Sequence, residues 1–357
     1  MEIDKLSEIS KLLEDLIMVP GVSGYEDPIR KKIKELTEDC LDRLEVDALG
    51  NLIGEKEGRG KTHLAFFAHM DELGLAAANI TADGFVRFKK MGGLDDRILP
   101  SRHVHIFTSE GAEIPGVVAW VPPHMALDGQ KNQDRVVAWH DLVIDLGARN
   151  AEEVKAMGVK IGDPIVFAKQ VSRLANNTLA SRGIDNRAGC AALVALIRSL
   201  KGTQTEPRIS FIFTTQEEYG LRGEAVSGYR TCPDSAFIID TASAPDFPGV
   251  PEIYKGQFQT GRGPLLRLVD SRMVTHQGLR SFVEKLAMEK NIPLQLGVVG
   301  GSTDAAEVQL AGGGIPTIPV CIPCRYTHST VETVSLDDIQ TTVRLLREII
   351  EGIACGR

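Results

Sequence analysis

One stretch of the chain, RISFIFTTQEEYG at residues 208–220, constrains the fold more than any other. Residues 209–215 are almost all β-branched or aromatic, and such a run predicts a buried strand. Two adjacent acids, Glu217 and Glu218, follow it, and then a glycine that indicates a turn. Because side chains alternate along an extended chain, we expect the two acids to diverge, so that one can bind a metal while the other acts as a base. The alternative is a pair of solvated acids in a surface loop.

The length and composition are those of a globular protein with more than one domain. The 357 residues exceed one typical domain, and 43 % are hydrophobic and 25 % charged. A net charge of −8 argues against nucleic acid or an anionic membrane as partner. No apolar run approaches the roughly 20 residues of a membrane span. The charged start, without the apolar core of a signal peptide, and six scattered cysteines interpreted as reduced thiols predict a cytoplasmic protein.

Strands and helices are expected to alternate at both ends of the chain. Apolar residues at helical spacing predict amphipathic helices, and one run that is apolar nearly all round predicts a buried helix. The expected helices are 6–17, 29–40, 187–200, 279–288 and 336–353, and the expected strands of this part are 63–69, 209–215, 236–240, 293–299 and 316–322. Residues 44–53 are expected to be extended, with a turn at Gly50 and Asn51. This order predicts an α/β fold in which a mixed sheet is flanked by helices.

The middle of the chain, residues 73–170, has a different character. Short strands with Gly- and Pro-rich joints are expected at 85–88, 103–107, 114–120, 142–145 and 164–167, with one helix at 151–157. Many short strands at regular spacing indicate a small β-barrel or a sandwich. We therefore interpret 73–170 as an inserted β-rich domain, and 1–72 with 171–357 as the main, catalytic domain.

Histidines and acids recur at the carboxyl ends of the predicted strands, or in loops that enter a helix. They are His69, Asp71, Asp185, Glu217, Glu218, Asp240 and His328. In open α/β sheets this edge is where ligands bind. Imidazole and carboxylate groups from separate elements are ligands that zinc, cobalt or manganese would take.

The number of these side chains supports two metal ions rather than one. One ion with three protein ligands would leave acids unused, whereas two ions can share a bridging carboxylate, with a histidine and another acid for each. Five residues meet that count: His69, Asp185, Glu218, Asp240 and His328. Glu217 is then free to act as a base, and Asp71 could hold the imidazole of His69 in the correct tautomer.

Each member of this set has an ordinary structural alternative. A lone histidine after a strand is often a turn residue, Asp185 could be an N-cap, and Asp240 could be a turn former. The structural alternative, however, requires all of these coincidences at one edge of one sheet.

The motifs that carry these residues resemble those of the M42 peptidases, the dimetal aminopeptidases that include the glutamyl, leucyl and lysyl TET enzymes. The matching segments are HMDE at 69–72, GIDNR at 183–187, TQEEYGLRG at 215–223, ID at 239–240 and RYTHSTVE at 325–332. Further matches are PGVSGYE at 20–26, residues 142–162 of the insert, and GSTDA at 301–305. The resemblance covers essentially the whole chain.

This resemblance implies a fold, a ligand scheme and an activity. One ion would be bound by His69 and Asp240 and the other by Glu218 and His328, with Asp185 as the bridge. Glu217 would be the base, and Asp71 would support His69. The insert would be a dimerisation domain, several relatives form tetrahedral dodecamers, and the substrates would be peptides that lose their N-terminal residue.

Two other functions remain open on the sequence. The same site could serve another dimetal amide hydrolase, such as an N-acyl amino-acid deacylase or a carboxypeptidase. The chain could also be a non-catalytic scaffold that uses the fold alone, although such a protein is expected to have lost a ligand or the base, and here none is lost.

Overall fold

The computed structural model describes residues 2–125 and 136–354 and divides into two compact units. The first unit contains Met1–Glu72, Val171–Thr327 and Val331–Arg357, and the second contains Leu73–Gln170 with His328–Thr330. Part of the predicted insert, residues 126–135, and one of the six cysteines, Cys355, lie outside the described residues. The other five cysteines are free thiols.

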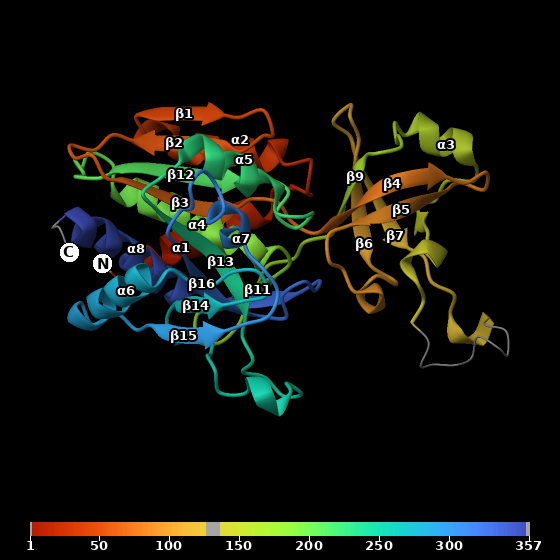
Figure 1. The fold of residues 1–357 in the computed structure, drawn as a ribbon. Helices are drawn as coiled ribbons and strands as arrows, with labels where there is room; N and C mark the ends of the chain where they lie inside the picture. Colours follow the sequence, from red (N-terminus) through yellow and green to blue (C-terminus); the bar gives the residue numbers. More distant parts are fainter. Residues whose placement is uncertain (1, 126–135, 355–357) are drawn as a thin grey trace. The chain divides into compact units, whose positions relative to one another are not determined.

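A mixed sheet of eleven strands forms the centre of the first unit (Figure 1). Nine strands follow one another across it in the order β1 (Arg43–Val46), β2 (Leu52–Lys56), β12 (Arg208–Thr214), β3 (His63–His69), β13 (Ser235–Ser243), β16 (Thr317–Arg325), β17 (Glu332–Ser335), β11 (Thr178–Ser181) and β10 (Ser172–Arg173). In addition, β14 (Leu265–Val269) pairs with β16 and with β15 (Gln295–Val298). The four central strands β12, β3, β13 and β16 are parallel, so their carboxyl ends meet at one edge.

Helices cover both faces of this sheet, as the sequence predicts. On one face α4 (Ile184–Ser199) packs on β3 and β13, and α1 (Glu2–Ile17), α2 (Asp27–Thr37) and α8 (Leu336–Ala354) pack on α4. The helix α6 (Gln277–Glu289) packs beside α8. On the other face α5 (Arg222–Thr231) contacts β12, and α7 (Ala305–Val308) contacts β16 and α5.

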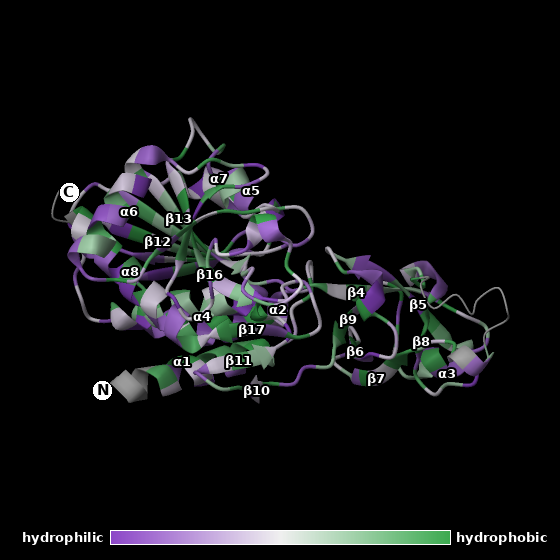
Figure 2. Cartoon of the chain, turned by 90° about the horizontal axis from the view of Figure 1, so that it is seen from below, coloured by the Kyte–Doolittle hydropathy of each residue, from purple (hydrophilic) through white to green (hydrophobic). Residues whose placement is uncertain are grey.

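The side chains of β3 alternate between these two faces. Phe66 belongs to the apolar cluster that contains the buried residues of α4. Phe67 belongs to a separate cluster that contains Val308 of α7. The central strands are accordingly apolar on both sides. In Figure 2 the ribbons of β12 and β13 are coloured mostly as hydrophobic. Because the side-chain period of a strand is two, His69 lies on the same face as Phe67.

The second unit is a closed barrel with its own apolar core. Its strands follow the order β4 (Gly74–Ile80), β5 (Phe85–Met91), β8 (Ile144–Asp145), β7 (Glu113–Val118), β6 (His103–Phe107) and β9 (Pro164–Phe167). Buried residues from each of these strands, among them Leu75, Val86 and Ile165, fill it. The unit also contains α3 (Ala151–Ala156). Of the two predicted architectures for the insert, the structure shows the barrel.

Several elements differ from the prediction. The strands β4, β10, β11, β14 and β17 and the helices α5 and α7 were not expected, and the expected helix 29–40 ends at Thr37 and continues as the 3₁₀ turn Glu38–Cys40. Other 3₁₀ turns are Asp96–Ile98, Pro123–Met125, Trp139–Asp141 and Glu252–Tyr254. Among the helices of the described chain, none combines the length and the apolar character that crossing a membrane requires.

Candidate metal centre

The parallel register of the central strands brings His69 and Asp240 to the same level. Ile238 of β13 lies opposite Phe67 of β3, and the same offset places Asp240 opposite His69. Both side chains lie on the α7 face, since each is two residues beyond a residue of that cluster. The prediction that Asp240 ends its strand is wrong, because β13 continues to Ser243 through its pairing with β16.

The two adjacent glutamates lie in the turn that follows β12. This strand ends at Thr214, directly opposite His69, and both its ends lie one residue earlier than predicted. Gln216 then adopts a φ of +57°, in the left-handed region that non-glycine residues rarely adopt. Glu217 and Glu218 follow this turn, and each belongs to a different group of possible metal ligands.

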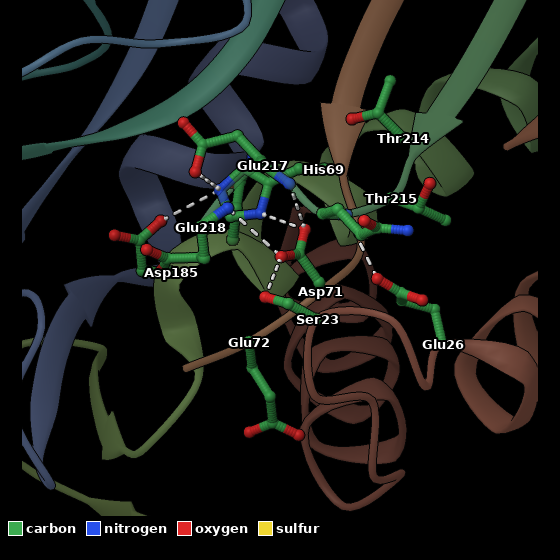
Figure 3. A network of polar contacts seen from close by, with 12 residues as sticks. Ser23, Glu26, His69, Asp71, Glu72, Asp185, Thr214, Thr215, Glu217 and Glu218 are labelled. Atoms are coloured by element: carbon green, nitrogen blue, oxygen red, sulfur yellow. Dashed lines mark hydrogen bonds and ion pairs between the residues drawn. The ribbon is translucent and has the colours of Figure 1, made fainter. Parts of the chain in front are cut away.

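The first group contains His69, Glu217 and Asp240, and Asp185 lies beside it (Figure 3). The Nε2 atom of His69 lies 3.4 Å from Oδ1 of Asp185, 3.5 Å from Oδ1 of Asp240 and 4.0 Å from Oε2 of Glu217. The imidazole is only 2 % exposed. One buried ring nitrogen is therefore surrounded by the oxygens of three carboxylates.

The second group of possible ligands contains Asp185 and Glu218 of the first unit, together with His328. As predicted, Asp185 lies just before the regular part of the buried helix. The helix α4 begins at Ile184, but Asp185 (φ −76°, ψ 108°) and Asn186 (φ −118°, ψ 41°) have non-helical angles. Its backbone N–H donates to Oε2 of Glu332 over 3.1 Å. His328 lies in the turn between β16 and β17 with a φ of +61°.

Asp71 is fully buried and connects the imidazole to the glutamate turn. Its Oδ1 lies 3.4 Å from Nδ1 of His69 and accepts the backbone N–H of Glu217 over 3.0 Å. Its Oδ2 accepts the N–H of Glu218 over 3.2 Å and the hydroxyl of Ser23 over 2.6 Å. Asp71 can therefore orient His69 and at the same time fix the backbone of both glutamates.

Burial and mutual repulsion disfavour charge on these acids. Desolvation is the largest cause that raises the pKa of Glu217 and of Glu218 well above 4.5, and neighbouring carboxylates raise both further. Burial lowers the pKa of His69, but the facing acids outweigh it and raise that pKa well above 6.5. A cation at this position would supply the missing positive charge.

The donor set fits a divalent cation in geometry as well as in charge. Ligands at about 2.0–2.1 Å from a tetrahedral ion are separated from one another by about 3.3 Å. The imidazole nitrogen of His69 lies 3.4 and 3.5 Å from its two nearest aspartate oxygens. These residues are thus arranged as ligands around an ion are, rather than as hydrogen-bonded partners.

Two further buried acids behind Glu217 were not expected from the sequence. Glu224 of α5 is fully buried, and burial raises its pKa to about 7. Asp304, just before α7, accepts the hydroxyl of Thr214 over 2.9 Å, and burial together with the charge of Glu224 raises its pKa well above 3.8. The only sequence signal was the GSTDA motif that contains Asp304, because nothing local marks Glu224 as buried.

Comparison with known proteins identifies the family. The model of the M42 glutamyl aminopeptidase family matches residues 50–345. The chain belongs to this family. As an M42 family member it is an aminopeptidase-type hydrolase, and the family is one of metal-dependent enzymes, in agreement with the two groups of possible ligands.

Similar proteins cover almost the whole length of this M42 chain. The lysyl aminopeptidase of Pyrococcus furiosus is 32 % identical over 96 % of the chain and 97 % of its own length. The glutamyl aminopeptidase of Lactococcus lactis is 29 % identical over 97 % of each. The solved structure of the Pyrococcus horikoshii TET1 peptidase has a TM-score of 0.88 and 37 % identity, and the match covers 96 % of this chain and 99 % of that one.

Proposed function

We propose that this M42 family member removes N-terminal residues from peptides by hydrolysis that depends on two divalent cations. One observation carries the proposal: the buried Nε2 of His69 lies at ligand spacing from oxygens of Asp185 and Asp240, at 3.4 and 3.5 Å, and 4.0 Å from Glu217, the candidate base. A hydrolytic site needs such a division between side chains that hold the ion and one that moves a proton.

The five proposed ligands fall into two sets that share Asp185. His69 and Asp240 would hold one ion, Glu218 and His328 the other, and Asp185 would bridge them. In support, His69 and Asp240 belong to one group of possible ligands and Asp185 and Glu218 to the other, and Oδ1 of Asp185 also lies 3.4 Å from Nε2 of His69. The mixture of imidazole and carboxylate ligands suits zinc or cobalt, with manganese as an alternative. When bound, such ions lower the pKa of a water molecule and polarise a carbonyl group.

Glu217 is positioned to move the protons of the reaction. Its carboxylate reaches the same space as Nε2 of His69 and Oδ1 of Asp240. As general base it would take a proton from the attacking water, and it would then return this proton to the departing amine. Asp71 would keep the ring of His69 and the backbone of Glu217 in place during both transfers.

The acidity of the site supports exopeptidase action. The free α-amino group of a peptide is positively charged, and Glu217, Glu218, Asp185 and Asp240 would offset the charge of the two ions where this group would bind. A blocked N-terminus lacks that charge and would be a poor substrate. The aminopeptidases of P. furiosus and L. lactis, named for lysyl and glutamyl residues, are similar in sequence to almost the whole chain.

We further propose that the protein acts as a homo-oligomer in the cytoplasm, with the barrel as its dimerisation domain. The similar TET1 peptidase of P. horikoshii can assemble into a tetrahedron or a large octahedral shell. The free thiols of the described cysteines agree with a reducing compartment. Light scattering of the purified protein should give a dimer or a multiple of it, and a monomer at micromolar concentration would contradict the proposal.

A substrate panel tests the activity directly. Metal-stripped protein is reconstituted with Zn²⁺, Co²⁺ or Mn²⁺ and given aminoacyl-p-nitroanilides, N-acetylated peptides and peptides with a blocked N-terminus but a free C-terminus. We expect hydrolysis of the aminoacyl substrates alone. Release of acetate from the acetylated peptides would indicate a deacylase, and loss of C-terminal residues would indicate a carboxypeptidase. Inactivity with every metal and substrate would favour the non-catalytic scaffold.

A further inference from the structure

The turn that carries Glu217 is held by side chains from three other parts of the chain. Four consecutive backbone N–H groups, those of residues 215–218, all donate to side-chain oxygens. Asn51 accepts the first, Glu26 the second, and Asp71 the third and fourth. The three acceptors are at most 4 % exposed, so none of these bonds competes freely with water.

The contact from Glu26 comes from the N-terminal segment PGVSGYE at 20–26, which contributes no group to the proposed proton transfers. A single oxygen of Glu26, Oε1, accepts the N–H of Gly24 over 2.7 Å and the N–H of Gln216 over 3.1 Å. Figure 3 shows Glu26 reaching the glutamate turn from the side opposite to Asp185. The same segment supplies Ser23, whose hydroxyl fixes Asp71.

The turn needs such support because its backbone is strained. Gln216 has a φ of +57°, a conformation that non-glycine residues avoid and that persists only where the surroundings impose it. Its N–H is the one that Glu26 accepts. Without this bond the left-handed turn loses an anchor one residue before Glu217, so its carboxylate could move relative to the ligands.

We propose that Glu26 is a positioning residue for the catalytic base, and that it acts through its reach to the N–H of Gln216 rather than through its charge. This inference rests on the proposed function of Glu217. A catalytic group has to be held within about 0.5 Å of its productive place, and a displacement of about 1 Å can reduce the rate about 100-fold. Loss of the anchor should therefore reduce kcat more than it changes KM or metal content.

Two substitutions of Glu26 distinguish the effect of its side-chain length from the effect of its charge. Glu26→Asp keeps the charge but shortens the side chain by one methylene, so it can no longer reach Gln216. Glu26→Gln removes the charge but keeps an oxygen at the position of Oε1, where both N–H groups are accepted. Glu35→Asp, at an exposed position of α2, is the matched control. We expect kcat to fall about 10- to 100-fold in Glu26→Asp and to stay within about threefold of wild type in Glu26→Gln and Glu35→Asp.

A second measurement does not depend on activity. In the metal-free proteins, hydrogen–deuterium exchange of peptides that cover residues 210–221 should be faster in Glu26→Asp than in wild type, and unchanged in Glu35→Asp. In the Glu217→Gln background, Glu26→Asp should have no further effect on kcat, since there is no base left to position. Both metal stoichiometry and KM should remain close to those of the wild-type protein.

Each of three results would overturn the inference: unchanged exchange in Glu26→Asp, a wild-type kcat despite faster exchange, or an equally large loss of kcat in the Glu217→Gln background. If Glu26→Gln were as impaired as Glu26→Asp, charge rather than reach would be responsible, and the inference would also be wrong. A wild-type protein that hydrolyses no aminoacyl substrate would refute the proposed function instead, while the exchange experiment would still decide whether Glu26 holds the turn.

Discussion

Replacement of Glu217 by glutamine should change activity and stability in opposite directions. Glutamine has nearly the same size, and the backbone N–H of residue 217 still donates to Asp71, so the turn should keep its shape. The amide cannot accept the proton of the attacking water. Loss of a general base costs about 10²- to 10⁴-fold in rate. At about 1.36 kcal/mol for each tenfold change, the barrier should rise by about 3–5 kcal/mol.

The same substitution should stabilise the metal-free protein. Burial raises the pKa of Glu217 well above 4.5, and Glu218, Asp240 and Glu224 raise it further, although His69 opposes them. A carboxyl group whose pKa is higher in the folded than in the unfolded state destabilises the fold progressively as the pH rises from about 4.5 through the raised value. Glutamine does not titrate, so the metal-free variant should lose less stability between pH 6 and pH 8.

Initial rates and unfolding curves test both halves of this prediction. The rates are measured with aminoacyl-p-nitroanilides after metal reconstitution, and urea unfolding of the stripped proteins is followed at pH 6 and pH 8. Glu57→Gln, at an exposed site, is the control. A variant that binds both metals and keeps kcat within tenfold of wild type would show that Glu217 is not the base. A variant less stable than wild type when metal-free at pH 8 would refute the electrostatic argument.

Three further predictions concern the fold, its pH dependence and the metals. Burial and the charge of Arg208 lower the pKa of His63 to about 4, so the stability of the protein should fall as the pH drops from 6.5 towards 4. The midpoint of urea unfolding should decrease less over this pH range in His63→Gln than in wild type. Phe66 stacks on two other phenylalanines, at 5.9 and 5.1 Å, so Phe66→Leu should cost about 1–3 kcal/mol in urea unfolding while the rate per folded molecule stays unchanged. His328→Ala should reduce the metal content, measured by elemental analysis after dialysis, from two ions to one per chain, whereas His140→Ala at an exposed site should leave it at two.

The central strands could be predicted because their sequences are apolar without interruption. The strand β3 and the strand β12 are recognisable from such runs, and so is the apolar helix α4. By contrast, β14 contains Arg267 in its centre, which breaks the pattern. The arginine is buried there because it pairs with Asp270 over 3.0 Å and donates to the carbonyl of Gly300. Such compensation comes from the tertiary structure and leaves no local signal.

The residues of the candidate site divide in the same way. Those that follow a recognisable strand, such as His69 and Glu218, could be selected from the sequence together with the edge they would share. Glu26 and Glu224 could not, because their importance arises from contacts with segments far away in the chain. The position of Asp240 inside β13 also depends on pairing with β16, which extends the strand beyond the point where its apolar run stops.

Successive side chains of β3 belong to two different apolar clusters, one on each face of the sheet. This arrangement limits where the chain can tolerate insertions and deletions. Deletion of one residue before His69 would exchange the two sides of the strand beyond the deletion, so that the imidazole would point towards α4 while a neighbouring alanine or methionine took its place among the acids. Deletion or insertion of two residues keeps each side chain on its face of the sheet. It nevertheless moves His69 by two residues along the strand, so that it no longer lies opposite Asp240. Loops at the opposite, amino-terminal ends of the strands are therefore where natural length variation, and insertions made in the laboratory, should be tolerated.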